Sequence, residues 1–369
     1  MPVNLYDLAP IFHLLLMAML IALLPLCWVW LRYAQESTLR RIQLLTWMTL
    51  FLTFDLVMFG AFTRLTDSGL GCPDWPGCYG FATPFGADVH IRDAQDNLPY
   101  GPVTFAKAWI EMVHRYLAMT VGGLILTLAA FAWFSRGKLK VQGLVFWPTL
   151  SLIWVCVQGA FGALTVTMKL FPMIVTLHLF GGLTLVAILI VQAQSHQYLI
   201  NAQSKVQVRS VTWWFACLGL VLLVMQVLLG GWVSSNYAVL ACNTFPMCQN
   251  VWWPDMNFAQ GFTLWRELGG DGQGGVLTFQ ALTAIHYVHR LFAYVVFVYL
   301  GWLAWRMHRQ LVWGSFVRVL TGLLLLQFIT GLSNVVLDWP LVAAVLHTGG
   351  GAALIAAMVW FLNGSKVKN

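Results

Sequence analysis

The sequence predicts an all-α polytopic membrane protein with nine transmembrane helices, arranged as two pseudo-symmetric four-helix bundles plus one extra amino-terminal helix. Composition is the first reason: 60% of the 369 residues are hydrophobic, only 9% are charged, and the mean hydropathy is +0.76. So much apolar surface exceeds what a soluble domain can bury, so the chain must face lipid. A series of long apolar runs and an internal repeat are the other two reasons.

The apolar runs match the thickness of a bilayer. About 20 helical residues cross roughly 30 Å of hydrocarbon. Runs of this length cover 11–31, 44–64, 106–134, 144–167, 172–195, 211–233, 281–304, 314–336 and 340–362.

The first of these runs lies outside the repeat. It starts without Lys or Arg, lacks a small-residue cleavage site and ends at Arg32, so it indicates a retained span and not a signal peptide. We therefore expect an extra helix with a cytoplasmic loop over 1–41, a first four-helix bundle over 42–200 and a second four-helix bundle over 201–369.

The basic residues that give the net charge of +7 indicate how the chain is oriented in the membrane. Lys and Arg form short clusters between apolar runs and no basic stripe with interleaved aromatic residues, which argues against a nucleic-acid partner. Placing these clusters in the cytoplasm satisfies the positive-inside rule, with the amino terminus outside and the carboxyl terminus inside. The clustered residues are Arg32, Arg40, Arg41, Arg136, Lys138, Lys140, Lys205, Arg209, Arg306, Arg309, Lys366 and Lys368.

A parallel repeat relates the two halves. Cys72 and Cys78 recur 170 positions later as Cys242 and Cys248. In the same way, Gln158, Gly162 and His178 recur 169 positions later as Gln327, Gly331 and His347. Internal repeats with a site in each half are a known way of building membrane proteins.

Each of the two long loops on the outer face of the membrane carries one cysteine pair, and the two pairs have the same spacing. An oxidising compartment favours disulfides between Cys72 and Cys78 and between Cys242 and Cys248. Metal binding is the alternative. Neither loop adds the second cysteine pair or histidine cluster that a tetrahedral site needs.

Four histidines lie at matching depth in the outer third of their helices: His114, His178, His289 and His347. Polar side chains inside a bilayer are costly and must find partners, so four at one depth indicate ligands. Paired imidazoles from two helices, with no Cys or carboxylate at the same level, are a poor zinc or copper set and a good axial pair for haem iron.

Two neighbours of these ligands carry chemical information. Arg115 and Arg290 each follow a histidine and are candidates to pair with haem propionates, although an interfacial Arg that reaches lipid phosphate is the alternative. One helical turn before the ligand, the first half has Glu111 where the second half has His286. A carboxylate beside haem can handle protons or hold a substrate, so Glu111 is the candidate catalytic residue.

These residues carry a family resemblance. The stretch from Gly60 to Pro76, the Glu111-to-Arg115 motif and the Gln158-to-Val166 segment together resemble haem A synthase, the haem O oxygenase of cytochrome oxidase assembly. The similarity spans about 45–360. The first span is a departure, because the family has an eight-helix pattern.

The resemblance implies an oxidoreductase of the bacterial inner membrane that hydroxylates the C8 methyl of haem O twice, through a hydroxymethyl intermediate, to give the formyl group of haem A. It implies haem O as substrate between His114 and His178, and a haem b cofactor between His289 and His347 that relays electrons. Haem O synthase would be the supplying partner. The electron donor and any homo-oligomer stay open.

Two other classes compete with this interpretation. A di-haem b electron-transfer cytochrome that oxidises quinol would share the paired histidines but would not need Glu in one half. A haem exporter would carry a tryptophan-rich loop. The segment Trp252-Trp253-Pro254-Asp255 resembles such a loop only over a short stretch.

Overall fold

The computed structural model describes residues 9–139, 144–201, 205–311 and 313–368. Of the basic residues that predict the topology, Lys140 lies outside these ranges. Two compact units divide the chain, one covering Met1–Leu170 and the other Phe171–Asn369. Each unit is described below by itself.

The helical prediction is confirmed. Within the described ranges, nine helices are long and apolar enough to cross a membrane, so the chain is a mostly helical, multi-pass membrane protein. These helices are α1 (Ala9–Arg32), α2 (Thr38–Leu65), α4 (Phe105–Leu139), α5 (Phe146–Thr167), α6 (Pro172–Asn201), α7 (Ser210–Ser235), α9 (Phe279–Arg309), α10 (Gly314–Val336) and α11 (Leu341–Gly364).

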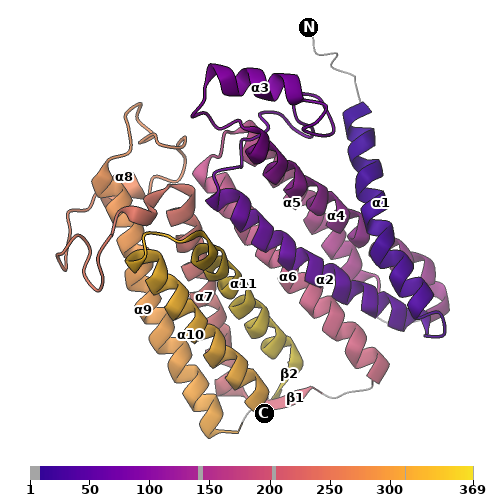
Figure 1. The fold of residues 1–369 in the computed structure, drawn as a ribbon. Coiled ribbons are helices and arrows are strands. Elements are labelled where there is room, and N and C mark those ends of the chain that lie inside the picture. The colour runs from indigo at the N-terminus through magenta and orange to yellow at the C-terminus, as the bar shows by residue number, and fades with distance from the viewer. Residues whose placement is uncertain (1–8, 140–143, 202–204, 312, 369) are drawn as a thin grey trace. The chain divides into compact units, whose positions relative to one another are not determined.

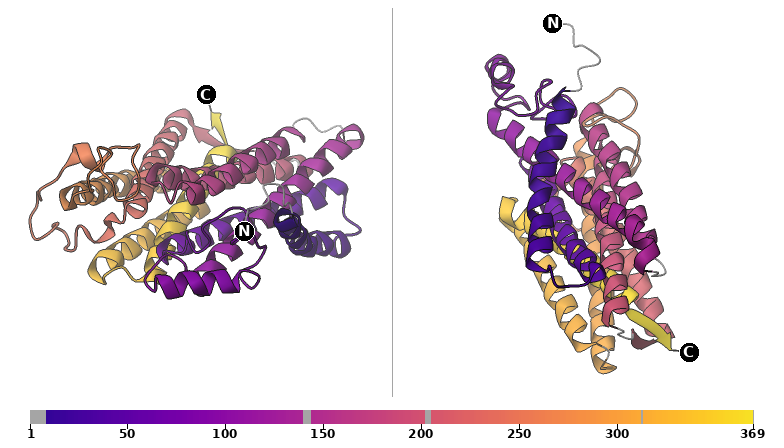
Figure 2. Two further views of the ribbon diagram at one scale, coloured as in Figure 1. Left: turned by 90° about the horizontal axis from the view of Figure 1, so that it is seen from above. Right: turned by 90° about the vertical axis from the view of Figure 1, so that its right-hand side faces the viewer.

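In the first unit, α2 packs against α4, α5 packs against α4, and α1 lies alongside both α2 and α4 (Figures 1 and 2). Buried aliphatic side chains join α1 and α2 to α4. The other face of α1 is apolar and exposed, with Phe12 at 66%, Leu24 at 71% and Leu31 at 80%. Exposed apolar surface of this extent is what a lipid-facing helix presents.

A loop with its own short helix, α3 (Asp88–Asn97), connects α2 to α4. The stretch after α2 that carries the family resemblance forms the start of this loop, where Thr66 caps the helix. The Thr66 hydroxyl bonds to the Phe62 carbonyl at 2.8 Å and contacts the Ser68 hydroxyl at 2.9 Å. The sequence therefore encodes a tight helix end directly before the first cysteine.

In the second unit, α7 packs against α9 and α10 packs against α11, while α6 contacts both α7 and α11. The loop between α7 and α9 contains the 3-10 helix η1 (Ala238–Leu240) and the short helix α8 (Phe258–Gly261). The compact units divide before α6, so the membership of α6 in the first four-helix bundle, which the repeat predicts, stays a prediction.

Two short strands are absent from the sequence prediction. β1 (Val206–Arg209) pairs in parallel with β2 (Ser365–Lys368), with Val206 opposite Ser365. Each strand has four residues, too few for a period-two pattern to stand out beside apolar helices. The pair ties the segment before α7 to the segment after α11.

The charge distribution predicts which loops face the cytoplasm. A reporter enzyme joined at Lys205 or Lys368 is expected to be active only in the cytoplasm, and one inserted in α3 only outside, because basic loops stay on the cytoplasmic side. Activity of paired alkaline phosphatase and fluorescent protein fusions measures this. The opposite pattern at all three positions would reverse the topology.

Candidate functional site

Both cysteine pairs form disulfides, which confirms that interpretation over metal binding. The Cα atoms are 4.9 Å apart in Cys72–Cys78 and 4.6 Å apart in Cys242–Cys248. All four residues are buried. Each disulfide closes a small ring in the loop that precedes a histidine-bearing helix, α4 in the first unit and α9 in the second.

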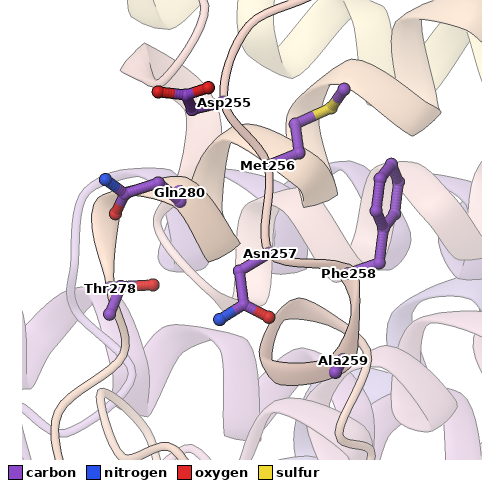
Figure 3. Close-up of a pocket in the computed structure, with 7 residues that line it drawn as sticks. All are labelled: Asp255, Met256, Asn257, Phe258, Ala259, Thr278 and Gln280. Carbon is purple, nitrogen blue, oxygen red and sulfur yellow. The ribbon is translucent and has the colours of Figure 1, made fainter.

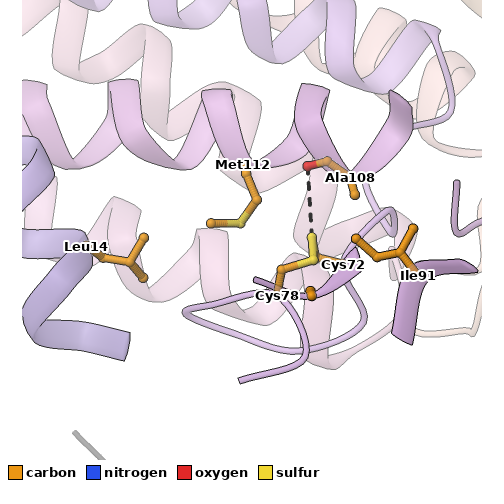
Figure 4. Packing of buried hydrophobic residues seen from close by; sticks show 7 residues of the cluster. Leu14, Cys72, Cys78, Ile91, Ala108 and Met112 are labelled. Atoms are coloured by element: carbon orange, nitrogen blue, oxygen red, sulfur yellow. Dashed lines mark hydrogen bonds between the residues drawn. A yellow bond between two sulfur atoms is a disulfide. The ribbon is translucent and has the colours of Figure 1, made fainter. Parts of the chain in front are cut away.

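The first disulfide packs directly on α4. Cys72 and Cys78 lie in a cluster with Leu14, Ile91, Ala108 and Met112, and the Cys72 sulfur contacts the Ala108 carbonyl at 3.9 Å (Figure 4). Gly71 makes this approach possible, because a Cβ there would lie 2.4 Å from the Lys107 carbonyl carbon. The loop thus rests on the first turns of α4, one to two turns before His114.

Glu111 and Arg115 bind this loop from α4. The Glu111 carboxylate accepts the Cys72 backbone N–H at 2.7 Å and pairs with the Arg115 guanidinium at 2.6 Å. Arg115 also donates to the backbone carbonyls of Asp74 at 2.9 Å and Pro76 at 3.2 Å. Both side chains are buried. Their charges compensate one another, which a buried pair requires.

In the second unit, α9 binds its disulfide loop in the same way, with His286 in place of Glu111. His286 Nδ1 accepts the Cys242 backbone N–H at 3.3 Å, as Glu111 accepts that of Cys72. Arg290 donates to the carbonyls of Thr244 at 2.7 Å and Cys242 at 3.0 Å. The residue one turn before His114 or His289 therefore accepts the first cysteine N–H in both halves. Only in the first half does it carry a carboxylate.

The two arginines therefore have partners that the sequence did not indicate. Their terminal nitrogens donate to carbonyls of the disulfide loops, and these contacts account for the burial of both side chains. Contact of Arg115 and Arg290 with haem propionates stays a prediction. A guanidinium has five N–H donors, so loop anchoring leaves some donor capacity.

His289 on α9 and His347 on α11 are both in the second unit. The Gln226 amide nitrogen lies 3.1 Å from His289 Nδ1 and 3.2 Å from the His289 carbonyl oxygen. Gly230 on α7 leaves room for the ring, since a Cβ there would be 3.0 Å from His289 Cε1. Sequence reasoning missed Gln226, which differs from Leu56, the residue 170 positions earlier.

His347 on α11 is surrounded by one turn of α10. The Gln327 amide donates to the His347 carbonyl at 3.0 Å, and the Thr330 hydroxyl lies 3.0 Å from His347 Nδ1. A Cβ at Gly331 would lie 3.0 Å from His347 Cε1. Sequence reasoning identified Gln327 and Gly331 as repeat positions without their contacts. It missed Thr330, because the sequence shows only that a residue with a hydroxyl group stands one turn after Gln327.

The first-half histidines lie in different compact units. His114 on α4 packs against α2: a Cβ at Gly60 would be 3.0 Å from His114 Nε2, and the Phe59 ring stacks at 6.4 Å. His178 is on α6, and its buried Nδ1 has no hydrogen-bond partner among the described residues. Binding of one haem between His114 and His178 stays a prediction.

The residues around these rings fit haem ligation. Three of the four histidines stand against a glycine whose missing side chain leaves space beside the imidazole. In the described ranges, no group of three or more His, Cys, Asp and Glu side chains forms a metal cluster, so the available donors are imidazoles. Imidazole pairs suit haem iron and not a tetrahedral zinc site.

A pocket elsewhere in the second unit lacks such donors. It lies in the loop that precedes α9 (Figure 3). Its lining residues are Asp255, Met256, Asn257, Phe258, Ala259, Thr278 and Gln280. With no histidine or arginine among them, we do not assign it to haem.

The sequence matches a known family over most of its length. The family model described as cytochrome oxidase assembly protein matches residues 41–359. This chain belongs to the cytochrome oxidase assembly protein family. The match begins after α1, so the extra first helix is a feature of this chain that the family model does not cover.

Relatives agree with the family match. This member of the cytochrome oxidase assembly protein family is 37% identical to a heme A synthase of Shewanella oneidensis, over 85% of this chain and 94% of that protein. It is 27% identical to a heme A synthase of Brucella anthropi, over 79% of this chain and 83% of that protein. A third, from Brucella ovis, is 26% identical over 79% of this chain and 82% of that protein.

The disulfides predict a distinct pattern of thiol reactivity. In unreduced, denatured protein, a maleimide is expected to label Cys27, Cys156 and Cys217, which are free, and to miss the four loop cysteines. Closing rings of this size restricts the unfolded loop and contributes about 2 kcal/mol each. Mass spectrometry of the labelled peptides gives the count. A mixed Cys72–Cys248 peptide would contradict two separate loop disulfides.

Proposed function

We propose that this chain is a haem A synthase, an oxidoreductase that converts the C8 methyl of haem O to a formyl group. Two successive hydroxylations give first the hydroxymethyl intermediate and then a gem-diol, which loses water to leave the formyl group. With dioxygen as oxidant, each hydroxylation consumes an electron pair and two protons and releases one water. The similarity to proteins named heme A synthase supports the reaction.

One structural observation carries the assignment of the reactive half. The buried Glu111 and Arg115 pair lies on α4 beside His114, and the second unit has His286 in place of Glu111. A proton-consuming reaction needs a group that can hold a proton, and a carboxylate does this near the position where protons are used. We therefore place haem O between His114 and His178.

The geometry explains how Glu111 can serve in two ways. An ionised carboxylate has about four acceptor positions. The Cys72 N–H and the Arg115 guanidinium occupy one on each oxygen, so both oxygens keep capacity for a proton or a water. The anchor fixes the side chain, and the remaining lone pairs stay available. Holding a reactive group on a rigid helix lowers the cost of orientation.

The second half provides the electron path in this proposal. A resident haem b ligated by His289 and His347 would supply one-electron transfer. Thr330 contacts Nδ1 of His347, and a partner on the other ring nitrogen is typical of metal-ligating histidines. The alternative, a di-haem b quinol-oxidising cytochrome, accounts for the paired histidines but gives no use to the carboxylate of Glu111. The enzyme's location in the bacterial inner membrane and its supply by a haem O synthase belong to the same proposal.

The resident haem predicts a difference between the halves. His289→Ala or His347→Ala is expected to abolish the low-spin absorption of haem b, because each removes one axial ligand, whereas His114→Ala or His178→Ala leaves most of it. Optical spectra and pyridine haemochrome analysis of the purified variants measure the loss. Survival of the resident spectrum in both second-half variants would place that haem elsewhere.

Replacing the carboxylate of Glu111 tests the reaction itself. Glu111→Gln keeps an acceptor for the Cys72 N–H but cannot hold the proton, so conversion of haem O is expected to fall by roughly 100-fold or more, with the hydroxymethyl product accumulating. Haem content should persist. Chromatography of extracted haems gives the product distribution.

A matched carboxylate change controls for charge alone. Asp88→Asn removes an exposed carboxylate of the same unit that pairs with Arg92, and it should leave haem A production unchanged. Thiol labelling of Glu111→Gln checks that the Cys72–Cys78 loop is intact. A normal haem A yield from Glu111→Gln with bound haem would contradict a proton-handling role.

A further inference from the structure

The Thr330 hydroxyl donates its single hydrogen to a backbone carbonyl of its own helix. It lies 2.7 Å from the Leu326 carbonyl oxygen, the partner one turn back on α10, and 3.0 Å from His347 Nδ1. A hydroxyl donates one hydrogen and accepts through its lone pairs. Because the hydrogen bonds to the Leu326 carbonyl, the Thr330 oxygen must accept from the imidazole.

This direction fixes the tautomer of His347. An imidazole that donates through Nδ1–H carries its free lone pair on Nε2. Nε2 is then ready to bind iron, and the hydrogen bond to Thr330 raises its basicity. The backbone at this position is held as well, because the Gln327 amide donates to the His347 carbonyl at 3.0 Å, and the ring edge occupies the space that Gly331 leaves open.

Gln327 is itself locked in place. A Cβ at Gly350 would lie only 2.2 Å from its amide nitrogen, so the Gln327 side chain fills a notch that glycine leaves in α11. Two residues of α10 thus contact the carbonyl and the Nδ1 of one histidine, and a third, Gly331, leaves the space that the ring edge occupies. Thr330 is also buried, with 5% of its surface exposed, which keeps water from competing for Nδ1.

The first half keeps two of these three residues. Gln158 and Gly162 stand 169 positions before Gln327 and Gly331, but Phe161 stands where the second half has Thr330. A phenyl ring offers no acceptor for an imidazole N–H. The buried Nδ1 of His178, the repeat counterpart of His347, has no partner among the residues that the structure describes.

We propose that Thr330 is a positioning residue that holds His347 as the Nδ1–H tautomer and thereby keeps the second-half haem firmly ligated for electron transfer. The inference rests on the proposed function, because it takes His347 as a ligand of the resident haem. The corresponding repeat position of the first half is Phe161, which has no hydroxyl, and a less firmly fixed ligand suits a site where substrate must enter and product must leave.

Removing only the hydroxyl tests the proposal. Thr330→Val is expected to retain haem but to raise the midpoint potential of the resident haem, because a less basic imidazole stabilises ferric iron less. Carbon monoxide should displace His347 from the reduced iron roughly tenfold more readily. Protein purified without a source of haem O gives both readouts, by spectroelectrochemistry and by carbon monoxide titration.

Two variants make the result specific. Thr330→Ser keeps the hydroxyl and should restore wild-type values. Thr321→Val removes a hydroxyl from the same helix that contacts its own turn, the Val317 carbonyl at 2.9 Å, and should change neither readout.

The outcomes separate this inference from the proposed function. Wild-type potential and carbon monoxide affinity in Thr330→Val, with haem lost in His347→Ala, would overturn the role of Thr330 alone. Haem retained in His347→Ala would overturn the ligand assignment and the inference with it. A Thr330→Val protein that lost all haem while Thr330→Ser kept it would support a stronger dependence on the hydroxyl.

Discussion

The absence of water from the bilayer core is the constraint on which this structure depends. A polar group there must find its partner inside the protein, because an unsatisfied one costs several kcal/mol. The Thr side chains of α2 meet the demand locally by bonding to carbonyls one turn back, as Thr46 and Thr49 do at 2.8 Å. Longer side chains meet it between helices or between a helix and a loop, and those contacts build the site.

The disulfide loops are the clearest product of this constraint. A guanidinium near the membrane surface needs several acceptors, and a loop folded over the helix end offers backbone carbonyls that have no partner in regular structure. Arg115 and Arg290 take them, and the disulfides keep those carbonyls in position. In return, the loops shield the ends of α4 and α9, on which His114 and His289 stand. In each half, the loop, its disulfide and the helix that bears the histidine therefore hold one another in place.

Sequence reasoning predicted what the bilayer and the repeat impose. Span lengths follow from hydrocarbon thickness, so each candidate span in the described residues was predicted, and the equal spacing of the cysteine pairs predicted both disulfides. Partners of polar side chains were not predictable in the same way. Arg115 follows a histidine, which favours a propionate, yet its carbonyl partners belong to a loop whose path depends on Gly71 and on packing around Cys72. Thr330 was missed because threonine is common in such helices, and only the structure shows that its hydroxyl faces His347.

Two halves with one scaffold can differ in chemistry through few side chains. A glycine beside an imidazole, an arginine on the loop carbonyls and a glutamine on α5 or α10 recur in both halves. The differences fall at corresponding positions of the repeat: Glu111 against His286, and Phe161 against Thr330. Each change acts in the same direction. The first half gains a group that can hold a proton and lacks a hydroxyl at the position that fixes a ligand, while the second half loses the carboxylate and gains the hydroxyl. A site that transforms a haem needs the first set, and a site that only passes electrons is better served by the second.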